Sequence, residues 1–168
     1  MDTNSEQVLI RLLRTQRVAA LGTLRDGGPL VSQVLFAAAP DFSAFYMHIS
    51  RLAQHTQDIL GDPRVSLMIA DTDDGIGDPL QLARVSIRGE AAIIAPGTDE
   101  YAAARTGYLA KFPQAAVNFQ LGDFALYRIE PQAARYVAGF GKAFNLRRDG
   151  FLKLALSAVA VDGGLGED

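Results

Sequence analysis

The sequence predicts a mainly β fold with helices, an α+β protein built on a closed antiparallel barrel. Short apolar segments with the composition of strands recur at near-regular spacing and are separated by turn-forming residues. Tight turns such as Arg25-Asp26-Gly27-Gly28 join the first three segments, which argues against a doubly wound parallel sheet. No G-x-G-x-x-G pattern follows the first strand, so a Rossmann-type dinucleotide site is not indicated.

The individual elements follow from periodicity and from turn or cap residues. Val8, Leu9, Leu12 and Leu13 recur at helical spacing and predict an amphipathic N-terminal helix. The predicted helices cover residues 4–16, 52–60, about 98–111 and a short piece from Pro113. The predicted strands cover residues 18–24, 30–37, 44–49, 65–70, 83–95, 123–130 and 134–137. Gly89 predicts a bulge or bend in its strand, and residues 139–142 predict a flexible, partly basic turn.

Length and composition describe one globular domain. The chain has 168 residues, of which 49% are hydrophobic and 21% charged, enough to fill a sizeable core. We assign residues 1–146 to this domain and residues 147–168 to a C-terminal tail, with an apolar segment followed by a mobile acidic end.

Charge and cysteine content exclude several classes of function. The net charge of −3 gives no basic field for nucleic acid, and the absence of Cys excludes disulfides, thiolate metal sites and Cys nucleophiles. The acidic Gly-rich loop at residues 71–79 lacks the spacing and the terminal Glu of an EF-hand, so we expect no metal site. No apolar run is long enough to span a bilayer, and the polar N-terminus is not a signal peptide. We expect a cytoplasmic protein that does not bind membranes.

The segment from Phe45 to Ile69 contains the side chains that are best suited to bind a ligand. It reads as strand, polar corner, short helix, turn and strand, with Ser50 and Arg51 at the corner and His55 and Thr56 on the helix. Hydroxyl and guanidinium donors at a helix N-terminus could hold a phosphate or another dianion. The alternative is that Ser50 is only an N-cap beside a solvated Arg. His48 lies on the strand, where a structural role is expected.

Four pieces of the chain resemble one known family. They are ALGTLRDGGPLVSQVLFA (20–37), HISRLAQHTQDILGDPRVSLMI (48–69), ARVSIRGEA (83–91) and GDFALYRIEPQAARYVAGFGKAFNL (122–146). In combination they resemble the pyridoxamine 5'-phosphate oxidase-like, FMN-binding split-barrel superfamily. The likeness is greatest to its haem-utilisation, HugZ-like branch and covers most of residues 5–146.

The resemblance implies a homodimer of six-stranded antiparallel split barrels with two FMN sites at the interface. By this likeness the flavin phosphate would lie at Ser50, Arg51, His55 and Thr56. The flavin ring would face the second strand at Gln33, Val34, Leu35 and Phe36. The second protomer would reach FMN through Arg84, and the site would be closed near the ring by Phe140, Gly141 and Lys142.

Two departures from the family pattern shape the expected function. The true oxidases carry an Arg and a Lys on the second strand, where this chain has Ser32 and Ala37, so a strict pyridoxamine phosphate oxidase is not expected. The haem-degrading relatives use a late histidine as axial ligand, but the histidines here are His48 and His55. Haem would need another ligand, such as Tyr136.

The leading expectation is an FMN-binding flavoprotein, an oxidoreductase that acts on a small or planar substrate at the dimer interface. No Ser-His-Asp order, nucleophile elbow or zinc motif argues for other chemistry, and no catalytic residue stands out. The alternatives are a haem-binding or haem-degrading protein, and a non-catalytic flavin carrier or sensor.

Overall fold

The structure is a computed structural model that describes residues 1–162, with side chains described as far as residue 158. Residues 163–168, most of the segment predicted to be a mobile acidic end, lie outside the described residues. None of the helices in the described part of the chain is long and apolar enough to cross a membrane.

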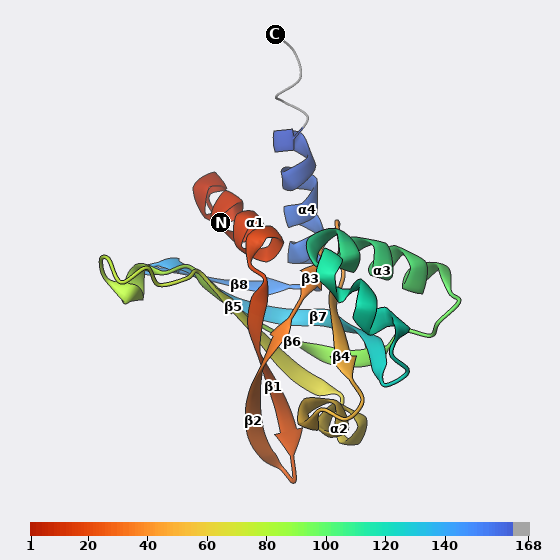
Figure 1. Cartoon of the computed structure of the whole chain (residues 1–168). Helices are drawn as coiled ribbons and strands as arrows, with labels where there is room; N and C mark the ends of the chain where they lie inside the picture. Colours follow the sequence, from red (N-terminus) through yellow and green to blue (C-terminus); the bar gives the residue numbers. More distant parts are fainter. Residues whose placement is uncertain (163–168) are drawn as a thin grey trace.

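A curled antiparallel sheet forms the body of the molecule (Figure 1). Its strands are β1 (Val18–Arg25), β2 (Gly28–Leu35), β3 (Ala37–Ala38), β4 (Phe45–Ser50), β5 (Arg64–Ala70), β6 (Arg84–Ile93), β7 (Phe124–Gly139) and β8 (Lys142–Arg147). They are ordered β2-β1-β5-β6-β7-β4-β3, with β8 paired to β7. The α+β, split-barrel prediction is confirmed, although the sheet has eight strands rather than six.

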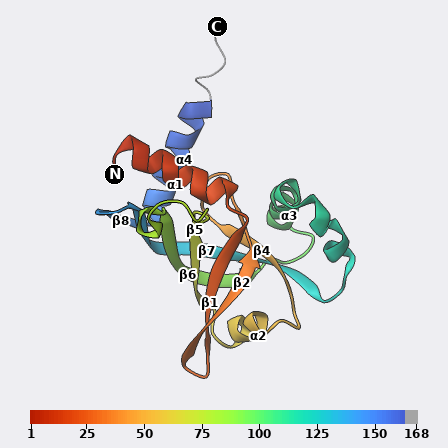
Figure 2. The same cartoon turned by 60° about the vertical axis from the view of Figure 1, so that its left-hand side comes forward.

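Helices cover the ends of the sheet, as the two views in Figures 1 and 2 show. They are α1 (Thr3–Thr15), α2 (Gln54–Gly61), α3 (Asp99–Lys111) and α4 (Arg148–Asp162), with 3₁₀ turns η1 (Pro79–Gln81) and η2 (Pro113–Gln120). α1 and α4 lie together at one end, α2 lies at the other, and α3 with η2 flanks β4.

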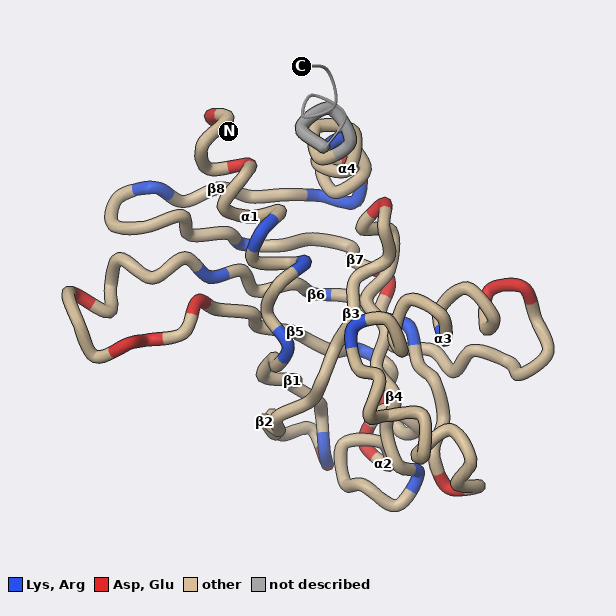
Figure 3. The backbone as a smooth tube through the Cα atoms, turned by 45° about the horizontal axis from the view of Figure 1, so that its top comes forward, with Lys and Arg blue, Asp and Glu red and all other residues tan. Residues whose placement is uncertain are grey.

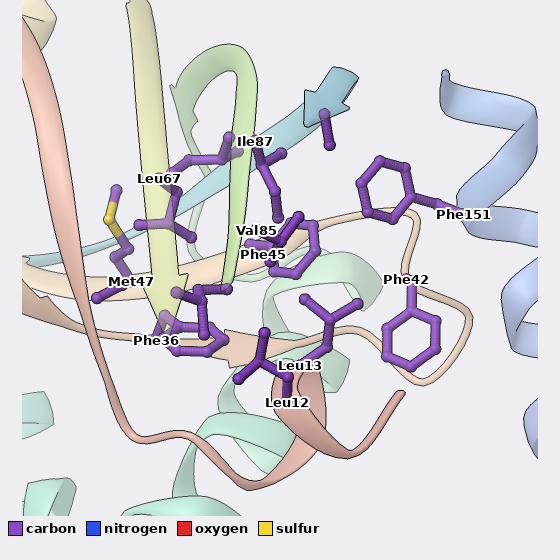
Figure 4. Packing of buried hydrophobic residues seen from close by; sticks show 14 of the residues in the cluster. Leu12, Leu13, Phe36, Phe42, Phe45, Met47, Leu67, Val85, Ile87 and Phe151 are labelled. Carbon is purple, nitrogen blue, oxygen red and sulfur yellow. The ribbon is translucent and has the colours of Figure 1, made fainter. Parts of the chain in front are cut away.

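The core lies between the inner face of the sheet and the helices α1 and α4 (Figure 4). The predicted apolar face of α1 places Leu9, Leu12 and Leu13 in this core, where each is fully buried. The C-terminal segment contributes Phe151, whose ring meets that of Phe45 edge-on at 6.0 Å. Each such side chain adds about 2 kcal/mol of apolar burial, so α4 packs against the same core as the barrel.

The predicted break between the last two strands is wrong. β7 runs through Pro131, which lacks an N–H and is normally confined to edges or bulges. The bulge predicted at Gly89 explains this, because the register of β6 and β7 shifts at Arg88/Gly89 and Gly89 pairs with Pro131. A Cβ on Gly89 would lie 2.1 Å from the carbonyl oxygen of Glu130, so the close approach requires glycine.

The C-terminal hairpin adds a strand that the sequence reasoning missed. Residues 139–142 form a turn as predicted, with positive φ at Gly139 and Gly141. The following residues then pair with β7 as β8. β8 and the two-residue β3 account for the difference between the predicted six strands and the observed eight.

Candidate functional site

The corner between β4 and α2 is built by internal hydrogen bonds. Ser50 Oγ donates to Asp123 Oδ2 at 2.9 Å and accepts from the Leu52 backbone N–H at 3.1 Å. Thr56 is fully buried, and its hydroxyl donates to the Ser50 carbonyl at 2.7 Å. α2 begins only at Gln54, with Ala53 as its N-cap, so the interpretation of Ser50 as a helix cap is wrong.

Of the predicted phosphate donors, Arg51 is the one whose side chain is exposed. Its backbone N–H donates to the Asp123 carbonyl at 2.6 Å, and its own carbonyl accepts from Gln57 Nε2. The corner therefore combines one exposed guanidinium with the carboxylate of Asp123. A carboxylate bonded to Ser50 competes with an incoming dianion for the same donor.

His55 points its two ring nitrogens into different environments. Nδ1 lies 3.2 Å from Ser32 Oγ, so α2 is tied to strand β2. Nε2 is buried and has no hydrogen-bond partner among the described residues. Burial lowers the pKa of His55, more than the nearby Asp58 carboxylate raises it, which favours the neutral imidazole.

An open cleft of about 420 Å³ lies beside Ser32 on the outer face of the sheet. Its lining is Gln16, Val18, Ala19, Ala20, Val31, Ser32, Gln33, Met68, Ala70, Asp71 and Thr72. Asp71 is fixed at the rim, since both of its oxygens accept from Arg11, at 2.9 and 2.7 Å. Apolar side chains such as Val31 and Met68 line it together with polar ones such as Gln33, a combination typical of a ligand site.

The predicted ring-facing residues of β2 divide between the two faces of the sheet. Gln33 is exposed and lines the cleft, and Leu35 is 38% exposed. Val34 and Phe36 point into the core, at 5% and 0% exposure. Only their backbone groups could contact a molecule held outside the sheet.

The remaining predicted residues lie elsewhere in the same chain. Arg84 begins β6, and its guanidinium donates to the carbonyls of Leu82 and Leu80. Phe140, Gly141 and Lys142 form the tip of the β7–β8 hairpin. The sheet order places β7 four strands from β2, and Figures 1 and 2 show the tip of the β7–β8 hairpin away from β2.

The candidate haem ligand Tyr136 is unavailable. Its ring is fully buried, and its hydroxyl donates to the Ser5 carbonyl at 2.9 Å. His48 is also buried, as expected of a structural residue, with its ring stacked on Phe119 at 3.6 Å. Burial, with a smaller contribution from Arg105, lowers the pKa of His48 to about 4.

Several residues near these groups were not found by sequence reasoning. Asp123 is hydrogen-bonded to Ser50 although the two residues are 73 positions apart in the sequence. Ser32 contacts His55, which is 23 positions away. Lys111, at the end of α3, holds a buried amine 4.3 Å from the centroid of the Phe36 ring. None of these pairings has a local sequence signal, because each depends on how strands assemble.

Comparison with curated proteins finds relatives named for haem. Over 139 residues the chain is 40% identical to the chloroplastic haem oxygenase HOZ of Arabidopsis thaliana, covering 82% of this chain and 40% of that one. Over 125 residues it is 23% identical to the haem oxygenase HutZ of Vibrio cholerae, covering 74% and 70%. The chain thus spans less than half the length of the plant relative.

Solved structures give the same fold. A haem-binding protein from Mycobacterium smegmatis matches with a TM-score of 0.80 at 27% identity, over 91% of this chain and 62% of that one. HutZ from Vibrio cholerae, described as a haem storage protein, matches with a TM-score of 0.68 at 20% identity, over 76% of this chain and 89% of that one.

The family assignment combines the fold with a match along most of the chain. The profile described as pyridoxamine 5'-phosphate oxidase covers residues 6–138, and the similarity to HOZ and HutZ agrees with the resemblance to the haem-utilisation branch. The chain belongs to the pyridoxamine 5'-phosphate oxidase family.

Proposed function

We propose that this protein is a homodimer that binds haem in the cleft beside β2. The observation that carries the proposal is the contrast between two surfaces. The cleft is lined by the apolar side chains of Val31 and Met68, which are 69% and 39% exposed. The predicted phosphate corner instead holds the Asp123 carboxylate on Ser50.

Similarity to named haem proteins supports this choice. HOZ is 40% identical over most of this chain, and both curated relatives carry the name haem oxygenase. A porphyrin needs a broad apolar surface that excludes water, whereas FMN needs a site for a dianionic phosphate. The cleft fits a porphyrin better than the corner at Ser50 and Arg51 fits a dianionic phosphate.

Among the described residues, His55 is the candidate that would hold the haem iron. His55 has an Nε2 without a partner, and Ser32 on the wall of the cleft contacts its Nδ1. A hydrogen-bonded second nitrogen is the usual outer contact of a metal-binding histidine. Because Nε2 is covered by protein atoms and α2 packs on the inner side of β1 and β2, strand β2 would have to shift for the imidazole to reach iron in the cleft.

Bound haem would supply iron redox and oxygen chemistry. This chain would contribute the rest: Val31 and Met68 would exclude water, while Gln33 and Thr72 would position polar edges of the ligand. Arg11 pairs with Asp71, which offsets the negative charge at that edge of the cleft.

The outer face of the sheet supports the proposed homodimer. Four large apolar side chains remain exposed on neighbouring strands: Val18, Val31, Leu35 and Met68, at 44%, 69%, 38% and 39%. A second copy that covers this face would also complete the cleft.

FMN is the second candidate. The family fold and the exposed guanidinium of Arg51 favour it, and the flavin ring would then lie along Gln33 with the phosphate at the corner. The protein would then act as a flavin oxidoreductase or as a non-catalytic flavin carrier.

Absorption spectroscopy during separate titrations with haemin and FMN tests the proposal. We expect a Soret band that shifts on binding and elutes with the protein through gel filtration, at one haem per protomer. Flavin bands that co-elute while haemin does not would overturn the haem assignment in favour of the second candidate. A protein that retains neither cofactor would overturn both.

A further inference from the structure

The amine of Lys111 is buried against aromatic rings at the end of α3. Its Nζ atom has no hydrogen-bond partner among the described residues. It lies over two phenyl rings, 4.3 Å from the centroid of Phe36 and 5.9 Å from that of Phe112. An ammonium group has three N–H donors, so a buried position without an acceptor favours the neutral amine.

A second cation lies beside this amine. Arg17 is exposed just before β1, and its guanidinium lies over the same Phe112 ring, 5.3 Å from the centroid. The Phe36 N–H donates to the Arg17 carbonyl at 3.3 Å, which connects the two places. Helices α1 and α3 both contact β3, and Figure 3 shows basic residues on the chain beside β3. Among the described residues, no carboxylate forms an ion pair with Lys111 or Arg17.

These surroundings keep a large share of the Lys111 amine uncharged. Burial, with a smaller contribution from Arg17, lowers the pKa of Lys111 to about 8. At that pH about half of the amine is neutral, compared with roughly 0.4% of a lysine amine at the reference pKa of about 10.4. The neutral form has the lone pair that makes lysine a nucleophile. The Lys111 amine can therefore react with an electrophile near neutral pH.

The burial of Nζ restricts which electrophile can reach it. The reactant has to be small and uncharged, because protein atoms cover Nζ and the rings of Phe36 and Phe112 are apolar. Lys111 does not line the cleft beside β2, so a ligand held in that cleft does not meet the amine. Carbon dioxide is small, uncharged and electrophilic at carbon. The guanidinium of Arg17 offers the positive charge that the anionic product needs.

We propose that Lys111 takes up carbon dioxide as a carbamate, with the Arg17 guanidinium as the counter-ion of the new carboxylate. The Nζ lone pair forms a bond to the carbon of carbon dioxide, and one C–O π pair moves onto oxygen. The nitrogen then loses a proton to water. One amine and one carbon dioxide thus give one carbamate anion and one proton, with no oxidation or reduction. The reaction does not involve the cofactor in the cleft.

A purely structural ammonium at Lys111 is the alternative. A cation–π contact with Phe36 would then hold the charge in place. That contact leaves the N–H donors without acceptors, and it leaves Arg17 without a counter-ion among the described residues. The carbamate accounts for both observations, because it replaces the charged amine and pairs with the neighbouring guanidinium.

Chemical trapping on the unmodified protein tests the proposal. The protein is equilibrated at about pH 8 with isotopically labelled bicarbonate, which supplies carbon dioxide, and is then treated with triethyloxonium, which converts a carbamate into a stable ethyl ester. Peptide mass spectrometry locates the label and assigns the N-terminal amine separately. We expect the label on Lys111 and not on the other two lysines, Lys142 and Lys153, which are exposed. An unlabelled Lys111, or equal labelling of all three lysines, would overturn the proposal.

A pair of variants tests the role of Arg17. Arg17→Gln removes the counter-ion, so the carbon dioxide concentration that half-saturates Lys111 should rise about tenfold, the effect of losing one charged hydrogen bond. Arg14→Gln is the matched control, because the Arg14 guanidinium lies over the Phe42 ring instead, 5.7 Å from its centroid. Equal half-saturation in the two variants would overturn the assignment of Arg17 as counter-ion.

Urea unfolding gives a second readout that needs no trapping reagent. In the unfolded chain the Lys111 amine is almost fully protonated at about pH 8, so the carbamate forms mainly in the folded state. Bicarbonate should therefore raise the urea midpoint relative to chloride at equal ionic strength. Lys111→Met should abolish this response, and it removes a buried charge rather than adding one. No rise in the unmodified protein, or an equal rise in Lys111→Met, would overturn the proposal.

Discussion

Ser32 Oγ lies 3.2 Å from His55 Nδ1 and connects the wall of the cleft to helix α2. The contact occupies one ring nitrogen and leaves the buried Nε2 without a partner among the described residues. An unpaired buried polar atom has a cost of about 1–3 kcal/mol. The unpaired Nε2 is the reason that we propose His55 as a contact for the bound ligand.

His55→Ala should therefore change the haem complex. Loss of the imidazole should shift or weaken the Soret band and raise the haem dissociation constant about tenfold, which optical titration measures. Added imidazole should restore the band if His55 is a ligand. The control is His48→Phe, which retains a ring on Phe119. Identical spectra for the His55 variant and the unmodified protein would remove His55 from the site.

Arg51→Ala separates the two cofactor candidates. If FMN places its phosphate at the corner, losing the exposed guanidinium should weaken FMN binding by about 1.5–3 kcal/mol, the scale of a charged hydrogen bond. Haem binding at the cleft should not change. Fluorescence quenching of FMN measures the effect, with the exposed Arg147→Ala as the matched control. Equal FMN affinity in both variants would contradict the phosphate assignment.

The parts of the fold that were predicted have local causes. The α1 stripe follows from the spacing of Leu9, Leu12 and Leu13, and the first hairpin follows from Asp26-Gly27, both of which adopt positive φ. The bulge at Gly89 is local as well. Each of these signals lies within a few residues of the structure that it produces.

The parts that were missed depend on distant pairings. Pro131 looked like the end of a strand because its tolerance depends on a bulge in β6, some 40 residues earlier. Ser50 looked like a cap because nothing near it reveals that its hydroxyl donates to the Asp123 carboxylate. A single sequence shows which side chains can donate hydrogen bonds at the site. It does not show which acceptors in the folded protein already receive those hydrogen bonds.

A buried pair beneath the β1–β2 hairpin should contribute measurably to stability. Thr23 Oγ1 donates to Asp58 Oδ2 at 2.9 Å, and these residues are only 3% and 5% exposed. Thr23→Val keeps the shape but removes the donor, so the free energy of unfolding should fall by about 1–3 kcal/mol. Urea denaturation measures it. Thr106→Val, at an exposed helix position, is the control, and equal losses in both variants would contradict this role.

Lys111 should make stability depend on pH. Burial, with a smaller contribution from Arg17, lowers the pKa of its amine to about 8, from 10.5 in the unfolded chain. Between these two pKa values the unfolded state binds more protons than the folded state. The free energy of unfolding therefore rises as the pH increases from about 8 to 10.5. Below pH 8 the amine is charged in both states, and the full cost of burying that charge lowers the free energy of unfolding. Lys111→Met should add about 1–3 kcal/mol at pH 7 and flatten this rise. An unchanged slope in urea denaturation across this range would show that the amine is solvated.

We expect substitution of the bulge residue Gly89 to cause the largest loss of stability in the sheet. A methyl group at Gly89 would meet the Glu130 carbonyl oxygen at 2.1 Å, and moving that carbonyl would disturb the pairing of β6 with β7. Gly89→Ala should therefore reduce the free energy of unfolding by about 3 kcal/mol. Gly61→Ala is the matched control, because a Cβ there meets nothing within 4 Å and the residue is helical. Thermal or urea unfolding of the two variants should differ clearly, whereas equal stabilities would mean that β7 can continue through Pro131 without this close approach.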